Sequence, residues 1–153
     1  MASETKKLSL ERRVREILRN ASDVLTAWKL PTDFRWTKNG VVHGEPMPAD
    51  FMGYVKKTGR VFFVECKEVE RRRLPMGQAP GLSAFQLQAA VEAAREDVPY
   101  VVVWCRPKTE RTLLWIVGPN PKEPSVAWPD DDEEAIHEED ELRDTLLRYL
   151  MEG

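Results

Sequence analysis

An apolar run that ends abruptly in charged residues constrains this chain more than any other feature. Residues 61–64 read Val-Phe-Phe-Val, a β-prone run without a polar side, which is typical of a strand buried on both faces. Glu65, Cys66 and Lys67 follow directly. Because side chains alternate along a strand, Glu65 and Lys67 point the same way, about 6.5–7 Å apart. Charges at the end of a central strand are costly to bury without partners, so this pair predicts a functional site.

A second carboxylate is expected beside the first. Asp50 begins an earlier apolar segment, residues 51–55, and residues 56–59 (Lys-Lys-Thr-Gly) look like a hairpin turn with Gly59 available for positive φ. That hairpin can return the chain so that Asp50 lies beside Glu65. Two adjacent carboxylates repel each other unless a cation lies between them, and hard oxygen ligands favour Mg²⁺. The sequence therefore predicts a magnesium site at Asp50 and Glu65.

The other segments predict an α/β fold with a mixed central sheet flanked by helices. Apolar spacing predicts helices and strands at these positions: a helix over 9–28, a helix over 84–96, strands over 99–105 and 113–117, and an amphipathic helix over about 142–151. Glycine and proline make 30–49 and 74–81 irregular, apart from a short strand at 34–36, and predict a flexible loop over 37–47.

Some polar residues have both a structural and a functional interpretation. Glu11 complements the dipole of the first helix or looks toward the core, and position alone favours the dipole. Gln86 completes a capping box with Ser83, which explains it on local grounds, or it faces the site. The arginines of the first helix and of 71–73 are solvated surface or phosphate contacts. His43 has no His or Cys partner nearby and is expected to be a loop histidine.

A chain of 153 residues is expected to be a single domain, 1–153. Charge is unevenly distributed along it. Residues 120–153 hold 12 acids and three bases, so the overall charge of −3 leaves +6 on residues 1–119, which is compatible with a nucleic-acid partner. The acidic stretch 130–141 is expected to be a poorly ordered linker that aids solubility. The less favoured hypothesis is that it mimics the charge of DNA.

The same composition predicts a cytoplasmic protein, since no apolar run approaches a membrane span or a signal peptide. Cys66 and Cys105 lie in predicted buried strands without metal-ligand spacing, so both are expected to be reduced.

Asp50 followed by Glu65-x-Lys67 resembles the PD-(D/E)xK nuclease superfamily, with Pro-Asp relaxed to Pro-Ala-Asp at 48–50. A helix carrying Glu11, the segment Phe-x-Gly-Tyr at 51–54 and Ser-x-x-Gln at 83–86 extend the resemblance over about 9–117. Together they look like the Holliday junction resolvases of that superfamily, RecU-like or archaeal-type Hjc-like.

The resemblance implies a homodimer with a restriction-endonuclease-like core that cuts four-way DNA junctions with Mg²⁺, for which Mn²⁺ substitutes. It makes Asp50, Glu65 and the backbone carbonyl of Cys66 metal ligands and raises Glu11 to a ligand, directly or through water. Lys67 would stabilise the pentavalent phosphate or handle the proton of the attacking water, and Gln86 becomes an active-site residue. DNA contacts are expected from seven basic residues: Arg12, Arg13, Lys56, Lys57, Arg71, Arg72 and Arg73. The alternatives are a duplex-nicking or DNA-repair nuclease of the same superfamily and a non-catalytic DNA-binding module.

Overall fold

A computed structural model describes residues 8–31, 34–43 and 46–152. The helices are α1 (Leu10–Asn20), α2 (Ala84–Arg95) and α3 (Glu139–Glu152), with a 3₁₀ turn, η1, at Asp132–Glu134. The strands are β1 (Leu25–Lys29), β2 (Phe34–Thr37), β3 (Gly40–His43), β4 (Phe51–Val55), β5 (Val61–Glu68), β6 (Arg73–Gly77), β7 (Leu82–Ser83), β8 (Tyr100–Arg106), β9 (Arg111–Ile116) and β10 (Ser125–Ala127).

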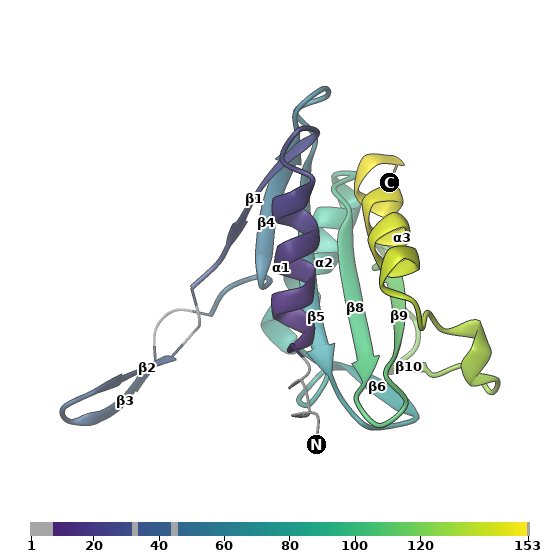
Figure 1. Ribbon diagram of the computed structural model, residues 1–153. Coiled ribbons are helices and arrows are strands. Elements are labelled where there is room, and N and C mark those ends of the chain that lie inside the picture. The colour runs from purple at the N-terminus through teal and green to yellow at the C-terminus, as the bar shows by residue number, and fades with distance from the viewer. Residues whose placement is uncertain (1–7, 32–33, 44–45, 153) are drawn as a thin grey trace, which may run out of the picture.

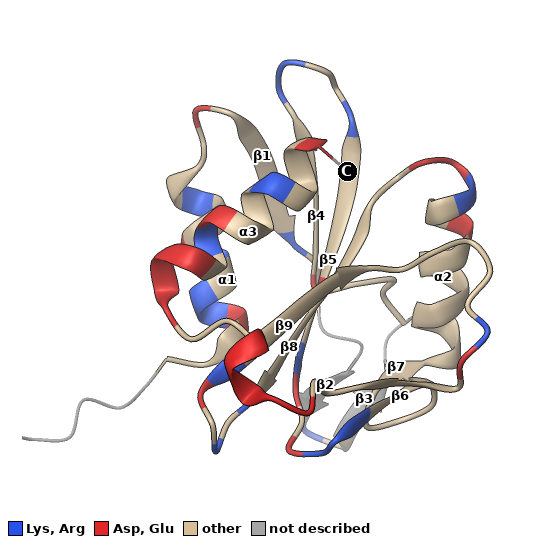
Figure 2. Cartoon of the chain, turned by 90° about the vertical axis from the view of Figure 1, so that its right-hand side faces the viewer, with Lys and Arg blue, Asp and Glu red and all other residues tan. Residues whose placement is uncertain are grey.

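A mixed sheet forms the centre of the molecule (Figure 1). Within the described residues it has five strands in the order β1-β4-β5-β8-β9, and β5 and β8 are parallel while the other neighbours are antiparallel. Helices α1 and α3 cover one face, and α2 lies on the other, as the turned view in Figure 2 shows. A small sheet, β10-β6-β7, lies on the same side as α2. The α/β class with a mixed central sheet flanked by helices is confirmed.

Alternation along β5 divides its side chains between the two layers. Phe62 and Val64 pack with α1 and α3, whereas Phe63 packs with the core on the α2 side. Tyr100 and Trp104 of β8 belong to that second core. Burial on both faces is what the unbroken apolar run of β5 predicts.

The hairpin between β4 and β5 forms as expected, with Gly59 at φ +72°. Gly53 of β4 is required for a different reason. A Cβ at this position would lie 2.1 Å from the carbonyl oxygen of Thr26 and 2.7 Å from Cζ of Phe62. The ring of Phe62 therefore takes the space above Gly53, and β1 and β4 approach closely there.

The helix predicted over 9–28 is wrong beyond Asn20. Ser9 caps α1 by accepting from the backbone N–H of Arg12, but Ala21 ends the helix. Residues 25–29 form β1, in which Trp28 lies opposite Met52 of β4. The apolar residues of this segment fit a helical spacing locally, but pairing with β4 gives their backbone a strand partner, and tertiary context overrides the weak local preference.

The segments predicted to be irregular contain further strands. The expected flexible loop is wrong over 37–43, because β2 and β3 pair as an antiparallel hairpin with Gly40 at φ +111°. β6 pairs with β7 and β10 within stretches rich in proline and glycine. β2, β3, β7 and β10 are short edge strands, where proline and glycine are tolerated. β6 contains Pro75 although it is the middle strand of its sheet.

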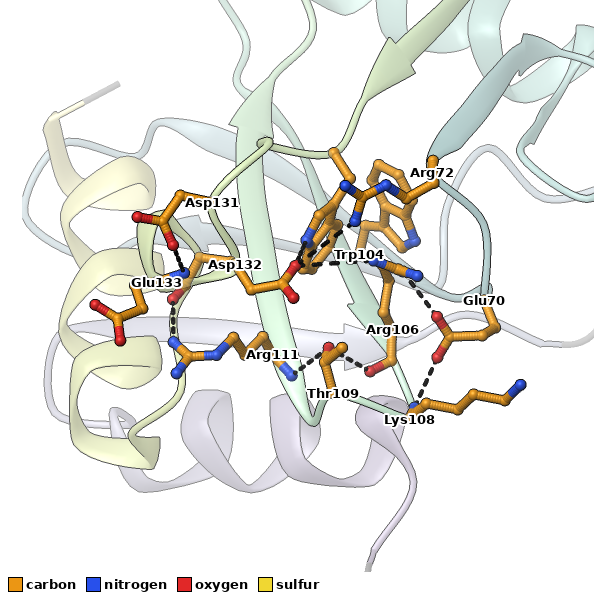
Figure 3. Close-up of polar contacts among 12 residues, drawn as sticks. Glu70, Arg72, Trp104, Arg106, Lys108, Thr109, Arg111, Asp131, Asp132 and Glu133 are labelled. Carbon is orange, nitrogen blue, oxygen red and sulfur yellow. Dashed lines mark hydrogen bonds and ion pairs between the residues drawn. The ribbon is translucent and has the colours of Figure 1, made fainter.

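The expectation of a poorly ordered linker over 130–141 is also wrong. Asp132 Oδ1 accepts a hydrogen bond of 2.7 Å from Trp128 Nε1 and lies 3.8 Å from a guanidinium nitrogen of Arg106. Figure 3 shows this network, in which Arg106 also donates to Glu70 at 2.7 Å. Ile136 then bridges to Thr112 of β9, and α3 begins at Glu139. Specific tertiary partners hold the segment against the body despite its acidic composition.

Both cysteines are free, as expected. Among the described helices, none has the length and apolarity that a membrane crossing requires.

Candidate active site

The start of β4 and the middle of β5 bring Asp50 beside Glu65. β4 begins at Phe51, which lies opposite Val64, so β5 continues beyond the start of its partner strand. The backbone N–H of Cys66, left without a partner in β4, donates to Asp50 Oδ2 at 2.9 Å. Because the N–H and C=O of a strand residue point to the same side, the carbonyl of Cys66 also points toward Asp50. The hairpin thus produces the juxtaposition that the sequence predicts.

Glu65, Lys67 and Gln86 form a connected polar cluster. Lys67 Nζ lies 3.1 Å from Glu65 Oε2 and donates to Gln86 Oε1 at 3.2 Å. Gln86 Nε2 in turn donates to Glu65 Oε2 at 3.0 Å. Gln86 also forms the capping box with Ser83 at the start of α2. Gln86 therefore caps α2 and also contacts Glu65 and Lys67, and the cap fixes its side chain at the point where α2 meets the site.

Glu65 is held in an unfavourable electrostatic setting. It is only 3% exposed. The pKa of its carboxyl group is raised from 4.5 to about 7, first by burial and then by the charge of nearby Asp50, while Lys67 opposes both effects. Oxygen Oε1 is buried and has no hydrogen-bond partner among the described residues.

The ion pair with Lys67 alone does not account for this arrangement. A salt bridge that served stability would satisfy both carboxylate oxygens, since an unpartnered buried polar atom costs about 1–3 kcal/mol. Here one oxygen is paired and the other is not.

These residues fit a divalent cation. The donors are the free Oε1 of Glu65, the carboxylate of Asp50 and the carbonyl of Cys66, all hard oxygen atoms. Within the described part of the chain, no group of three or more His, Cys, Asp and Glu side chains is arranged to hold a metal ion. Mg²⁺ in phosphoryl-transfer sites commonly uses one or two carboxylates and completes its shell with water and substrate oxygens. Two carboxylates and a carbonyl are therefore a suitable set.

Glu11 lies near the oxygen atoms of Asp50, Glu65 and Cys66, but its side chain pairs with Lys29 instead. Its Oε1 is 3.6 Å from Lys29 Nζ, and its side chain is 45% exposed. The neighbourhood is nevertheless strongly acidic: burial raises the pKa of the Cys66 thiol, and Asp50, Glu65, Glu11 and Glu68 raise it further. Glu68 Oε1 accepts from the backbone N–H of Leu10 at 3.1 Å and so joins the start of α1 to the end of β5. Glu11 contributes charge to the site, and the structure shows no direct contact between it and Asp50 or Glu65.

Tyr100 is a site residue that sequence reasoning missed. Its hydroxyl donates to the carbonyl of Pro48 at 2.5 Å and so anchors the segment that carries Asp50. Burial raises the pKa of this phenol, and Glu65 and Asp50 raise it further, so it remains a donor. In the sequence Tyr100 is one aromatic residue in an apolar strand, and no local signal sets it apart.

The basic residues expected to contact DNA are placed unequally. Arg13 does not present its charge to solvent: its side chain is 12% exposed, and it pairs with Glu139 of α3 at 3.2 Å. The exposed members of the set are Arg12, Lys56, Lys57, Arg71, Arg72 and Arg73. Arg72 lies 3.9 Å from Asp132, and Arg73 Nε donates to Ser125 at 2.7 Å. The side chain of His43 lies outside the described residues.

No family model and no curated protein matches the sequence. Among solved structures, the chain is similar to Hjc of Archaeoglobus fulgidus, described as a Holliday junction resolvase from an archaeal hyperthermophile. The match covers 87% of this chain and 97% of that one, with a TM-score of 0.49 and 16% sequence identity. The roles of residues in this chain therefore rest on its own contacts.

Proposed function

We propose that this protein is a Mg²⁺-dependent endodeoxyribonuclease that resolves four-way DNA junctions by hydrolysing phosphodiester bonds in pairs of strands. The observation that carries the proposal is the buried Glu65 carboxylate, whose Oε1 has no partner in the described chain although Asp50 lies beside it. A site that keeps two carboxylates close, with one oxygen unsatisfied, is stabilised when a cation binds.

Each residue has a role that its contacts support. Asp50, Glu65 and the carbonyl of Cys66 would hold the ion, which supplies Lewis-acid activation of the phosphate when bound. Lys67 places its ammonium group beside the same carboxylate and would stabilise the negative charge that develops on the phosphate oxygens. Gln86 holds Lys67 Nζ and Glu65 Oε2 in one arrangement, so both groups reach the substrate already oriented.

The substrate class comes from the motif resemblance and from charge. Asp50, Glu65-x-Lys67 and Gln86 match the resolvase pattern at the positions where the structure brings them together. The excess of basic residues over 1–119 suits a polyanionic partner. Symmetric cutting of two strands needs two active sites, so the proposal includes a homodimer.

The test incubates the protein with a synthetic four-way junction and a linear duplex of matched sequence, in Mg²⁺ or in EDTA. Paired nicks on the junction only, absent in EDTA and in Asp50→Asn, are expected. Replacement of Lys67 by Ala should reduce kcat while leaving junction binding in EDTA close to wild type, because Lys67 acts on the transition state.

Two results would favour the alternatives. Equal nicking of duplex and junction would indicate a duplex-nicking or repair nuclease with the same site. Tight junction binding without cleavage in Mg²⁺ or Mn²⁺ would indicate a DNA-binding module and would refute the catalytic proposal.

A further inference from the structure

Over the described ranges, part of the sheet on the α2 side is left uncovered. Helix α2 packs on β6, β7 and β8, and the strands at the other end of the sheet carry exposed apolar side chains on this face. Trp28 of β1 is 52% exposed and Tyr54 of β4 is 37% exposed, and their ring centroids lie 5.9 Å apart at an interplanar angle of 44°. Val61, opposite Tyr54, is exposed as well. We call Trp28, Tyr54 and Val61 the aromatic platform.

The aromatic platform lies on the face of the sheet that carries the active site. Phe51 and Val55 of β4 point into the core beneath α1, so Met52 and Tyr54 point to the opposite face. Glu65 points to that face too, because it bonds Gln86 of α2. Trp28 is the register partner of Met52, two residues from Asp50. Strand geometry therefore puts the Cα of Trp28 about 8 Å from that of Asp50.

A basic groove runs beside the same edge of the sheet. It has a volume of about 400 Å³ and lies between α1 and β1, on the face of the sheet opposite the aromatic platform, because Leu25 and Ala27 of β1 pack with α1 and Trp28 alternates with them. Trp28 is nevertheless one of its lining residues, since β1 is the edge strand. Its basic lining residues are Arg15, Arg19, Lys29 and Lys56, and no carboxylate lines it among the described residues. Figure 1 shows β1 as the outer strand of the sheet, with α1 beside it.

Three of these cations have contacts within the chain. Lys29 lies 3.6 Å from Glu11, Arg19 lies 3.7 Å from Glu16, and Lys56 Nζ donates to the carbonyl of Ser22 at 2.5 Å. The pair of Arg19 and Glu16 is exposed, so phosphate can replace Glu16 at small cost. Lys29 is 18% exposed and also donates to the carbonyl of Leu30 at 2.6 Å, so it is held more firmly.

We infer that the β1 edge is a subsite for an unpaired nucleotide segment next to the bond that is cut. Trp28 and Tyr54 receive a base on one face of the sheet, and the strand passes around the β1 edge so that the basic groove on the other face receives the adjoining phosphates. Proteins that hold single strands combine these two features, a positively charged groove and aromatic side chains on which bases stack. The inference rests on the proposed function for the identity of the strand, and it adds where that strand runs as it leaves the active site.

A second copy of the chain fits this surface less well. In a twofold interface the same patch faces itself. Two copies that met at the β1 edge would bring the four basic groove residues of one close to those of the other, which opposes association. A polyanion gains from the same charges.

The experiment measures binding by fluorescence anisotropy in EDTA, so that nothing is cut. The probes are a labelled oligothymidylate of about 12 nucleotides and a labelled four-way junction. Trp28→Ala should weaken binding of the oligonucleotide about tenfold, in the range measured for stacking of a base on an aromatic side chain. Trp28→Phe should retain most of the affinity, which separates stacking from misfolding. Ile116→Ala, an exposed apolar residue on the opposite edge strand β9, is the matched control and should bind like wild type.

Salt dependence separates the two parts of the subsite. Trp28→Ala should leave the slope of log K against log salt concentration unchanged, because no phosphate contact is lost. Arg15→Ala should reduce that slope by about 0.7 for single-stranded DNA.

Wild-type affinity in Trp28→Ala would overturn the inference. A change from dimer to monomer in Trp28→Ala, measured by sedimentation velocity, would also overturn it, because the platform would then be a subunit interface. Cleavage in Mg²⁺ is scored separately with the same proteins. Loss of binding in Trp28→Ala without any cleavage by wild type would refute the nuclease proposal and support the nucleic-acid subsite. Junction cleavage by the wild type, together with wild-type affinity in Trp28→Ala, would support the nuclease proposal and refute the nucleic-acid subsite.

Discussion

Replacing Glu65 with glutamine should stabilise the metal-free protein, although it removes a residue of the active site. Folding raises the pKa of the Glu65 carboxyl group from 4.5 to about 7, through burial first and then through the charge of Asp50. At about 1.4 kcal/mol for each pH unit, the ionised carboxylate costs the folded protein about 3 kcal/mol. Glutamine avoids this cost, and its amide can donate to Asp50 in place of a second negative charge.

The sign of the pH dependence follows from the two protonation states. Below pH 4.5 the carboxyl group is neutral in the folded and the unfolded chain, so it costs no stability. Between pH 4.5 and about 7 the unfolded chain has released the proton that the folded chain still holds, and stability falls as pH rises. Above about pH 7 both states are ionised and the cost stays constant. The difference in stability between Glu65→Gln and wild type should therefore grow by about 3 kcal/mol from pH 4.5 to 8.

The assay is urea unfolding of both proteins in EDTA at several pH values, supported by thermal melts. For a domain of this size about 3 kcal/mol corresponds to roughly 10 °C in Tm. Asp50→Asn is the matched second variant: without the neighbouring charge, Glu65 should ionise more easily and the pH dependence should shrink. A stability difference that stays constant from pH 5 to 8 would refute the electrostatic account of the site.

Three further outcomes are expected. At pH 8, Mg²⁺ at 100 times its Kd should stabilise the wild type by about 2.7 kcal/mol and should not stabilise Glu65→Gln or Asp50→Asn. Isothermal calorimetry gives the Kd. Equal stabilisation of all three proteins would contradict the assigned ligands. Gly53→Ala should lower the free energy of unfolding by roughly 3 kcal/mol, at the upper end of the range for overpacking, because its Cβ would lie 2.1 Å from a backbone oxygen of β1. An unchanged free energy of unfolding would show that β1 and β4 separate easily. Asp132→Ala should lower the free energy of unfolding by about 1–3 kcal/mol, since it leaves the buried indole N–H of Trp128 without its acceptor. Unchanged stability, together with unchanged proteolysis of the acidic segment, would contradict the ordered packing described for that segment.

Local sequence rules were most reliable where one pattern had one physical meaning. The capping box at Ser83 and Gln86 identified the start of α2, and Gly59 identified the hairpin turn. They failed over 21–29, where apolar spacing suits a helix and a strand alike. Only the pairing of β1 with β4, a contact between residues far apart in the chain, decides between them.

The sequence by itself determined that charge follows a doubly buried apolar run and that a hairpin joins Asp50 to Glu65. These are properties of neighbouring residues: alternation, turn chemistry and apolar runs. Only the tertiary structure decided that Glu11 turns toward Lys29, that Tyr100 anchors the segment before Asp50, and that Asp132 is held against the body. Each of these depends on a contact between groups that are remote in sequence, such as Asp132 with Arg106, and the distance between them is set by how the layers pack.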